Sequence, residues 1–177
     1  MENILETKRL IIRCFRDEDA KALYENHMDS EVRKWFPNEC YADWEEALEA
    51  IRFFAGCAER GQLPFVLGAE LKQTGELIGD AGLSEVEGRP GETEVGYCIG
   101  QKYRQNGYAA ELLEAMSVIA ASRFGIREIF GRVVHGNEAS EKVLLKNGFQ
   151  FIQEEFGAED DPCGNGMRVY SKTILKG

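Results

Sequence analysis

The stretch that decides the fold of this 177-residue chain is Tyr103-Arg104-Gln105-Asn106-Gly107-Tyr108-Ala109-Ala110. It stands between a strand-like run and a run with helical spacing. A glycine-containing turn that opens a helix leaves the first backbone N–H groups of the helix without partners. These groups, with the positive end of the helix dipole, can bind a phosphate or pyrophosphate. Arg104 adds a cation beside them.

The turn differs from the two commonest phosphate-binding loops. It is not Gly-x-Gly-x-x-Gly, and the chain contains no Gly-x-x-x-x-Gly-Lys-Ser/Thr. The dinucleotide-binding and P-loop interpretations therefore lose their main support. The pattern that is present, Arg-x-x-Gly-x-Ala over residues 104–109, is weak alone and depends on its neighbours.

Residues 92–100, just before the turn, alternate as a strand with one bare face. Thr93, Val95, Tyr97 and Ile99 share one face, and Glu94, Gly96, Cys98 and Gly100 share the other. Glycine within a strand often marks a bulge or the close approach of a ligand. Taken alone, the pattern fits a poorly packed edge strand with a solvated glutamate better than it fits a ligand-binding strand. Beside a phosphate-binding turn, it also suits an extended cofactor arm.

A core-facing helix and a further strand follow the turn. Apolar residues recur at helical spacing from Ala109 to Phe124, and Gly125 suits the C-cap. Residues 127–135 form the next strand, so we expect two parallel neighbours joined by a crossover helix. Asn137 is a suitable N-cap for a short helix that ends before Gly148.

Hydrophobic spacing predicts the remaining elements in the same way. Strands are expected at residues 4–15, 64–71, 76–83, 149–156 and 167–174. Asp17 and Asp43 can each cap a helix, and Ser30 can open a short helical turn. The connection 157–166 is long and acidic.

The composition indicates one domain without a nucleic-acid or membrane partner. The 21 basic and 31 acidic residues give a formal charge of −10, which argues against a nucleic-acid-binding face and is explained by solubility. No apolar run approaches membrane length, and the N-terminus has no apolar signal core. Cys14, Cys40, Cys57, Cys98 and Cys163 have no Cys-x-x-Cys spacing and indicate reduced thiols of a cytoplasmic protein. With only two histidines, we expect no metal site.

These motifs, in this order, resemble the GCN5-related N-acetyltransferase (GNAT) family from about Glu76 to Glu155. The phosphate turn of that family matches Arg104, Gly107 and Ala109, and its later helix matches Asn137 and Gly148-Phe149. Four further stretches resemble the RimJ/RimL-type branch, which is similar to ribosomal-protein Nα-acetyltransferases: Leu5 to Arg13, Gly79 with Gly82, Glu94-Val95-Gly96-Tyr97 and Asn137-Glu138-Ala139-Ser140.

The resemblance implies a single α/β (α+β) domain over residues 1–177. A mixed central sheet of about six to seven strands would carry helices on both faces. The acceptor side would comprise about residues 1–62, the acetyl-CoA-binding core about 63–156, and a C-terminal hairpin about 149–175. The family's acceptor pocket makes Trp35, Phe36, Tyr41 and Trp44 candidates for its wall, although core packing explains them as well or better.

The resemblance also implies transfer of an acetyl group from acetyl-CoA to a primary amine by direct attack in a ternary complex. Glu94 is the candidate base, although a structural glutamate that pairs across the sheet is an equal alternative. A bulge near Val95–Ile99 would free a backbone N–H for the thioester oxygen. The cofactor contacts would come from the backbone of Tyr97, Cys98 and Ile99, from Arg104, Gln105, Asn106, Gly107, Tyr108 and Ala109 at the pyrophosphate and, for the pantetheine arm, from Asn137.

The later helix departs from the family pattern at one position. Many GNAT enzymes carry a tyrosine there as the general acid for the leaving thiolate, and this chain has Leu144. Ser140, one turn earlier on the same face, is the candidate substitute, but it can equally support the helix start.

Three functions stay open from the sequence. The first is acetylation of a protein N-terminus or a small amine. The second is a catalytically silent acyl-CoA-binding or sensor module, which would need the turn but not Glu94. The third, a nucleotide-binding regulator, conflicts with the bare strand. The acidic stretch Glu159–Asp161 hints at a cationic acceptor, and the resemblance allows a homodimer.

Overall fold

An eight-stranded mixed sheet forms the middle layer of the computed structural model, which describes residues 3–37, 39–157 and 166–174. The strand order is β1-β2-β3-β4-β5-β6-β8-β7, and only β5 and β6 are parallel neighbours. The strands are β1 (Asn3–Glu6), β2 (Leu10–Arg13), β3 (Phe65–Leu71), β4 (Leu77–Glu85), β5 (Thr93–Ile99), β6 (Glu128–Val134), β7 (Gln150–Glu155) and β8 (Met167–Thr173). The expected single α/β domain is confirmed, with more strands than the six or seven expected.

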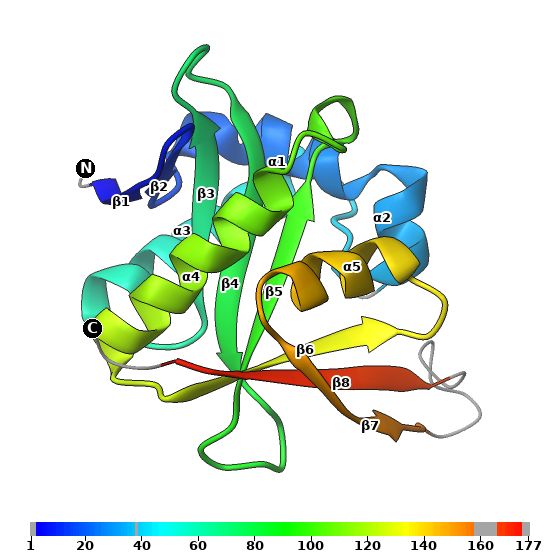
Figure 1. The fold of residues 1–177 in the computed structure, drawn as a ribbon. Coiled ribbons are helices and arrows are strands. Elements are labelled where there is room, and N and C mark those ends of the chain that lie inside the picture. The colour runs from blue at the N-terminus through cyan, green and yellow to red at the C-terminus, as the bar shows by residue number, and fades with distance from the viewer. Residues whose placement is uncertain (1–2, 38, 158–165, 175–177) are drawn as a thin grey trace.

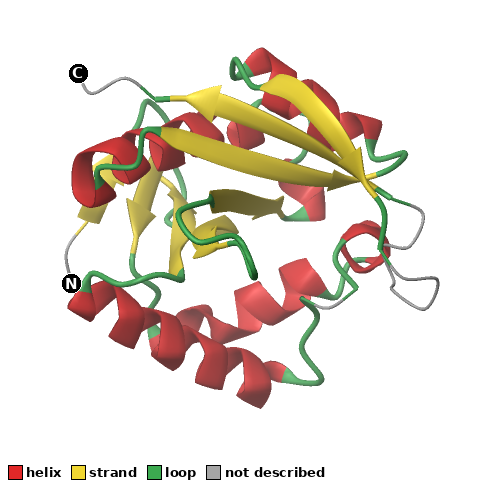
Figure 2. Cartoon of the chain, turned by 90° about the horizontal axis from the view of Figure 1, so that it is seen from below, coloured by secondary structure: helices red, strands yellow, loops and turns green. Residues whose placement is uncertain are grey.

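Helices cover both faces of the sheet, as Figure 2 shows from below. They are α1 (Ala20–His27), α2 (Ser30–Trp35), α3 (Trp44–Arg60), α4 (Tyr108–Phe124) and α5 (Glu138–Lys146), with 3₁₀ turns at Asp17–Asp19 and Gln101–Tyr103. Helices α4 and α5 lie on one face, while α1 and α3 pack on the other (Figure 1). The described helices include none that is long and apolar enough to cross a membrane.

The additional strand comes from the first segment of the chain. A single strand over residues 4–15 was the wrong expectation, because the segment folds back as the β1–β2 hairpin with Leu5 opposite Ile12. The Thr7 N–H donates to the Leu10 carbonyl at 2.9 Å, and Thr7 Oγ1 accepts from the Leu10 N–H at 2.9 Å. The hydroxyl of Thr7 thus stabilises a tight turn that periodicity alone does not reveal.

Two of the expected helix caps are confirmed by their hydrogen bonds. The Asp43 carboxylate accepts from the Glu46 N–H at the start of α3, and Asn137 Oδ1 accepts from the Ser140 N–H at the start of α5. Gly125 and Gly148 take positive φ angles just beyond α4 and α5.

The expected cap at Asp17 is wrong, and the expected start at Ser30 is confirmed with a cap that was not foreseen. Asp17 lies inside the 3₁₀ turn, and its carboxylate accepts from Arg52. The backbone N–H of Arg16, just before this turn, donates to Asp19 and not to Asp17. Helix α2 does begin at Ser30, but its cap is Asp29, whose carboxylate accepts from two backbone N–H groups. The charged carboxylate of Asp29 is a stronger hydrogen-bond acceptor than the hydroxyl of Ser30 for the unpaired N–H groups at a helix start.

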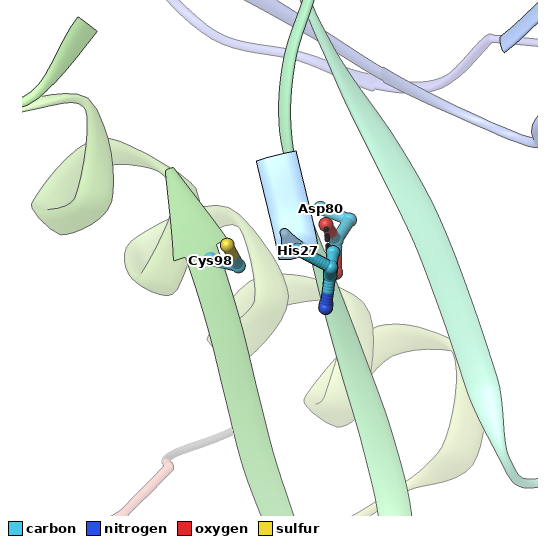
Figure 3. A group of neighbouring side chains, drawn as sticks. All are labelled: His27, Asp80 and Cys98. Carbon is cyan, nitrogen blue, oxygen red and sulfur yellow. Dashed lines mark hydrogen bonds and ion pairs between the residues drawn. The ribbon is translucent and has the colours of Figure 1, made fainter. Parts of the chain in front are cut away.

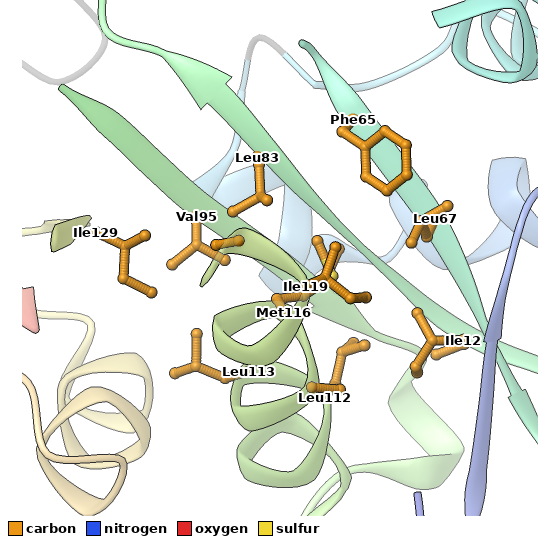
Figure 4. Close-up of a cluster of buried hydrophobic side chains, with 14 of the residues drawn as sticks. Ile12, Phe65, Leu67, Leu83, Val95, Leu112, Leu113, Met116, Ile119 and Ile129 are labelled. Atoms are coloured by element: carbon orange, nitrogen blue, oxygen red, sulfur yellow. The ribbon is translucent and has the colours of Figure 1, made fainter. Parts of the chain in front are cut away.

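The main core lies between α4 and the sheet (Figure 4). Leu112, Leu113 and Met116 of α4 are fully buried against side chains from β2, β3, β4, β5 and β6. The apolar spacing of residues 109–124 predicted this packing correctly, and the packing fixes the first turn of α4 at the carboxyl end of β5.

Strands β5 and β6 separate soon after they pair. Their parallel register covers only Thr93 with Ile129 and Glu94 with Phe130, and Figure 1 shows the two arrows diverging from there. Among the described residues, the side of β5 that faces β6 therefore has no strand partner from Val95 to Ile99. This opening positions the candidate site.

Candidate active site

Two cavities meet at β5. The larger, of about 750 Å³, lies against α1, α3 and the bare face of β5, and is here called the α3-side cavity. The smaller, of about 570 Å³, lies between the turn before α4, helix α5 and the end of β5, and is called the α4-side cavity. An extended ligand in the second cavity can therefore present one end to the first.

The predicted phosphate turn borders the α4-side cavity. Gln105 has φ +61° and Gly107 has φ +80°, so the chain coils tightly before α4 begins at Tyr108. Glycine adopts this conformation without the steric cost that other residues meet. The first N–H of this segment with an acceptor is that of Glu111, which donates to the Gly107 carbonyl at 3.2 Å. Within the described chain, the N–H groups of residues 105–110 have no protein acceptor, as an anion site requires.

Arg104 connects the turn to two other elements. Its Nε donates to the Ile99 carbonyl and its Nη2 to Asp29 Oδ1, both at 2.9 Å. Asp29 is the cap of α2, so the guanidinium joins the end of β5 to the start of α2. The expected cation is in place beside the turn, and it also serves as a structural tie.

Arg9 is a second cation at the turn. Its Nη1 donates to the Asn106 carbonyl at 2.8 Å, and its Nε donates to Glu111 at 2.7 Å. The guanidinium also lies 4.3 Å from the centre of the Tyr108 ring. Nothing in the sequence pattern links Arg9 to residues that lie about a hundred positions away, so sequence reasoning missed it.

The bulge expected near Val95–Ile99 is absent. Strand β5 pairs with β4 in unbroken register from Thr93 to Ile99. The free backbone groups arise instead because β6 turns away from the other edge of β5. Tyr97, Cys98 and Ile99 line the α4-side cavity, as the cofactor assignment requires.

Asn137 and Ser140 come from the start of α5 and line both cavities. Asn137 uses its side-chain oxygen for the cap, which leaves its NH₂ group available to a ligand. The N-cap role and a contact to a pantetheine arm are therefore compatible. Leu144 is buried and packs over Gly131, so it belongs to the core and not to either cavity.

Ser140 has a partner that sequence reasoning did not find. The Tyr97 hydroxyl, from β5, lies 2.8 Å from Ser140 Oγ. Burial raises the pKa of Tyr97 to about 12, and the hydrogen bond to Ser140 only partly offsets that rise. Tyr97 was expected to contribute backbone contacts alone.

Glu94 lies on the wall of the α3-side cavity with its carboxylate about a third exposed. Its Oε2 is 3.2 Å from Arg132 Nη1 on β6. Arg132 also contacts Glu92 and Glu155, so its single charge is shared among three carboxylates. The cross-sheet pairing foreseen as the alternative role is thus present, and it leaves the carboxylate accessible from the cavity.

A buried ion pair between His27 of α1 and Asp80 of β4 forms another part of the wall of the α3-side cavity (Figure 3). His27 Nε2 lies 2.9 Å from Asp80 Oδ2, and His27 Nδ1 lies 2.8 Å from the Glu39 carbonyl oxygen. Burial alone would lower the pKa of His27, but the Asp80 carboxylate and the Glu39 carbonyl outweigh it and raise the pKa to about 9. With an acceptor at each ring nitrogen, His27 is an imidazolium at neutral pH.

Cys98 lies beside this pair on β5, and its sulfur is within 4.8 Å of the nearest His27 and Asp80 ligand atoms. Burial raises the pKa of the Cys98 thiol well above its ordinary value. His27 and Cys98 each carry a proton on an atom that a metal would need, whereas Asp80 is the carboxylate that pairs with His27. The expectation of no metal site stays a prediction.

Glu39 adds a further carboxylate to the same cavity. Desolvation raises its pKa, the charges of Asp80 and Glu94 add to the rise, and His27 opposes it. Glu39 lies in the connection between α2 and α3, which carries no recognisable motif. Nothing in the sequence therefore indicated that Glu39 lines the cavity.

The aromatic candidates divide between cavity walls and surface. Trp35 and Phe36 line both cavities, and Tyr41 lines the α3-side cavity with its ring edge against His27. Trp44 is half exposed and lines neither cavity, so it belongs neither to an acceptor pocket nor to the core. The acidic stretch Glu159–Asp161 and Cys163 lie outside the described residues.

Comparison with known proteins agrees with this geometry. Residues 9–150 match the acetyltransferase (GNAT) domain. The chain belongs to the GNAT acetyltransferase family. It is 34% identical over 147 residues to the uncharacterized N-acetyltransferase YoaA of Bacillus subtilis (strain 168), covering 83% of this chain and 82% of YoaA. This GNAT protein is therefore an acyltransferase, and acetyl-CoA is the acyl donor that its family uses.

Solved structures of GNAT proteins share the fold. A GNAT-family acetyltransferase from Bacillus anthracis superposes with a TM-score of 0.80 at 22% identity, covering 96% of this chain and 98% of the other. RimL, a ribosomal L7/L12 α-N-protein acetyltransferase in complex with coenzyme A, superposes with a TM-score of 0.79 at 19% identity over 98% of both chains. The fold of the RimJ/RimL-type branch, expected from the sequence, is thus confirmed.

Proposed function

We propose that this GNAT protein transfers the acetyl group of acetyl-CoA to a primary amine by direct attack in a ternary complex. The observation that carries the proposal is the meeting of the two cavities at β5, with an anion site at one end and carboxylates at the other. Bound acetyl-CoA supplies the thioester whose carbonyl carbon the amine attacks.

The residues around the α4-side cavity fit acetyl-CoA. The free N–H groups of residues 105–110 would hold the pyrophosphate. The unpaired edge of β5 and the Asn137 side-chain NH₂ would bind the amides of the pantetheine arm. This arm would run from the turn towards the junction of the cavities, where Tyr97 and Ser140 lie.

Glu94 would remove the proton that the amine must lose. An alkyl amine is mostly protonated at neutral pH, since its pKa is near ~10, and a protonated amine has no lone pair for attack. The Glu94 carboxylate faces the cavity and shares Arg132 with two other carboxylates. It can accept the proton directly or through a water molecule.

The acceptor would be an amine that carries further positive charge. The carboxylates on the wall of the α3-side cavity are Glu39, Glu46, Glu49, Asp80 and Glu94. Of the described residues on that wall, the cationic side chains are His27, which pairs with Asp80, and Arg132, which pairs with Glu92, Glu94 and Glu155. Tyr41 and Phe53 add aromatic surface that suits a cation. Polyamines or basic peptide N-termini fit this surplus of negative charge, whereas free acidic amino acids do not.

A coenzyme A-release assay across amines tests this proposal. We expect kcat/KM for polyamines and basic peptides to exceed that for neutral or acidic amines by about tenfold or more, because each close ion pair contributes on the order of 1 kcal/mol. Raising the salt concentration should increase KM for the cationic acceptors and leave KM for neutral ones unchanged. Preference for acidic or uncharged amines would contradict the assignment of the acceptor.

Replacing Arg104 with alanine tests the cofactor end of the site. We expect the Kd of coenzyme A, measured by calorimetry, to rise about tenfold or more, since hydrogen bonds to charged groups contribute about 1.5–3 kcal/mol each. Asp29→Asn is the matched control, because asparagine still caps α2 but removes the charge from the other side of the ion pair. Unchanged affinity in Arg104→Ala would rule out a part for Arg104 in pyrophosphate binding, and equal weakening in both variants would assign Arg104 a structural part only.

A further inference from the structure

Helix α5 forms one wall of the α4-side cavity from its cap to its last residue. Its start lies where the two cavities join, because Asn137 and Ser140 line both of them. Lys142 and Lys146 line the α4-side cavity alone, and Lys146 ends the helix. At about 1.5 Å of rise per residue, Lys146 lies roughly 13 Å further along the helix than Asn137. The two lysines therefore mark the end of the cavity that lies away from the junction.

The positive charge of these lysines is not neutralised by strong ion pairs. Lys142 Nζ lies 3.9 Å from Glu138 Oε2, and the two side chains are 78% and 81% exposed, so this pair is weak. Within the described part of the chain, Lys146 has no ion pair. Among the described residues that line the α4-side cavity, Glu31 is the only carboxylate. An anion at this end of the cavity would thus meet two available ammonium groups.

The position of the lysines on the helix adds to this effect. Lys142 and Lys146 are one helical turn apart, so their charges repel each other. The dipole of α5 favours cations near its carboxyl end, which offsets part of the repulsion. The same end of the helix would repel an anion if it carried no lysines. An anion between the two ammonium groups would relieve their repulsion.

Coenzyme A carries a phosphate that can reach this position. Its pantetheine arm leaves one side of the pyrophosphate, and its adenosine, with a phosphate on the ribose 3′-oxygen, leaves the other side. The proposed function directs the pantetheine arm towards the junction of the cavities. The nucleotide end must then point away from the junction, towards Lys142 and Lys146. Val143 lines the same wall and offers apolar surface to the base.

We propose that Lys142 and Lys146 form a subsite for the ribose 3′-phosphate, and so select coenzyme A and its thioesters over their 3′-dephospho forms. The inference rests on the proposed function, which supplies the direction of the bound cofactor. A phosphate monoester carries a charge of about −1.5 to −2 at neutral pH, which two ammonium groups match. Backbone N–H groups of the turn would hold the pyrophosphate, while side chains of α5 would hold the third phosphate.

Calorimetric titration with coenzyme A and with 3′-dephospho-coenzyme A tests the subsite. We expect the parent to bind coenzyme A about tenfold more tightly, because exposed ion pairs are individually weak and two of them act together. The double variant Lys142→Gln/Lys146→Gln should lose this preference and bind 3′-dephospho-coenzyme A as the parent does. Added salt should reduce the preference of the parent, since both lysines are exposed to solvent.

The matched control is Lys102→Gln/Lys172→Gln, which removes two charges from lysines that line neither cavity. These lysines pair with Glu76 at 3.1 Å and with Glu114 at 2.9 Å. A loss of general attraction for an anionic ligand would appear in both double variants. Loss of the 3′-phosphate preference should appear only in the double variant of α5.

Steady-state kinetics gives a second readout. With acetyl-CoA as the donor, we expect the KM of Lys142→Gln/Lys146→Gln to rise about tenfold, as uniform binding is lost. With acetyl-3′-dephospho-CoA, the KM of this variant should equal that of the parent. A similar rise for both donors would overturn the inference, because the lysines would then act on another part of the cofactor or on the fold.

Equal affinity of the parent for the two titrated ligands would also overturn the inference, as would a control variant that loses the preference. These results would leave the proposed function intact if the parent acetylates an amine. If the parent prefers coenzyme A but acetylates none of the amines offered, the proposed function fails and the phosphate subsite stands. If the parent binds neither ligand, both fail.

Discussion

Replacing Glu94 with glutamine is expected to lower kcat by about 10²–10⁴-fold, the range for loss of a positioned general base. Glutamine keeps the size of the side chain and can still contact Arg132, but it cannot accept the proton of the amine. The Kd of coenzyme A should stay within about twofold of the parent value, because Glu94 lines the α3-side cavity and not the α4-side cavity. Steady-state coenzyme A release and calorimetry measure the two quantities.

Glu92→Gln is the matched control for this variant. Glu92 also contacts Arg132, at 3.1 Å, but it lines neither cavity. If both variants lose activity equally, the ion pair with Arg132 matters and not the carboxylate in the cavity. Near-parent turnover in Glu94→Gln would exclude Glu94 as the base and would direct attention to Glu39, whose raised pKa suits a base in the same cavity.

The same pair of measurements separates an enzyme from a silent acyl-CoA-binding module. A silent module would bind coenzyme A through residues 105–110 and would show no turnover that a change at Glu94 could reduce. Parent turnover that depends on Glu94 is therefore the result that the silent alternative cannot produce.

Local features of the sequence predicted the backbone geometry around the α4-side cavity well. The turn at Gly107, the cap at Asn137 and the C-cap at Gly125 each depend on a few neighbouring residues, and their geometry follows from backbone chemistry. The parallel pairing of β5 with β6 followed from the strand, turn, helix and strand order.

The acceptor end could not be predicted in this way. His27, Asp80 and Cys98 come from α1, β4 and β5, and only the tertiary fold brings them together. The hydrogen bond between Tyr97 and Ser140 joins residues 43 positions apart. The β1–β2 hairpin escaped notice because its turn, Thr7-Lys8-Arg9, contains neither glycine nor proline.

The buried pair of His27 and Asp80 predicts a strong pH dependence of stability. The pKa of His27 rises from 6.5 to about 9 on folding, which corresponds to roughly 3 kcal/mol of stabilisation. Because the folded-state pKa is raised, this contribution is fully present below pH ~6.5 and is lost as the pH rises towards ~9. We expect the free energy of unfolding to fall by about 2 kcal/mol between pH 6 and pH 8, measured by urea titration.

Asp80→Asn should remove most of this dependence. The variant should also be destabilised at pH 6 by about 3–5 kcal/mol, because it leaves the imidazolium buried without its counter-ion. The window ends at pH 8 so that ionisation of cysteine in the unfolded chain, with a pKa near ~8.5, contributes little.

Asp19→Asn is the matched control, because Asp19 forms an equally buried ion pair with Arg13 at 2.7 Å. Its loss should destabilise the protein as well, but the pH dependence between 6 and 8 should persist, since arginine does not titrate in that range. A parent protein whose stability is flat over this window would mean that His27 is neutral in the fold. The acceptor cavity would then carry one more unpaired negative charge than proposed, which would strengthen its preference for cationic amines. A slope that survives in Asp80→Asn would assign the pH dependence to a group outside the His27–Asp80 pair.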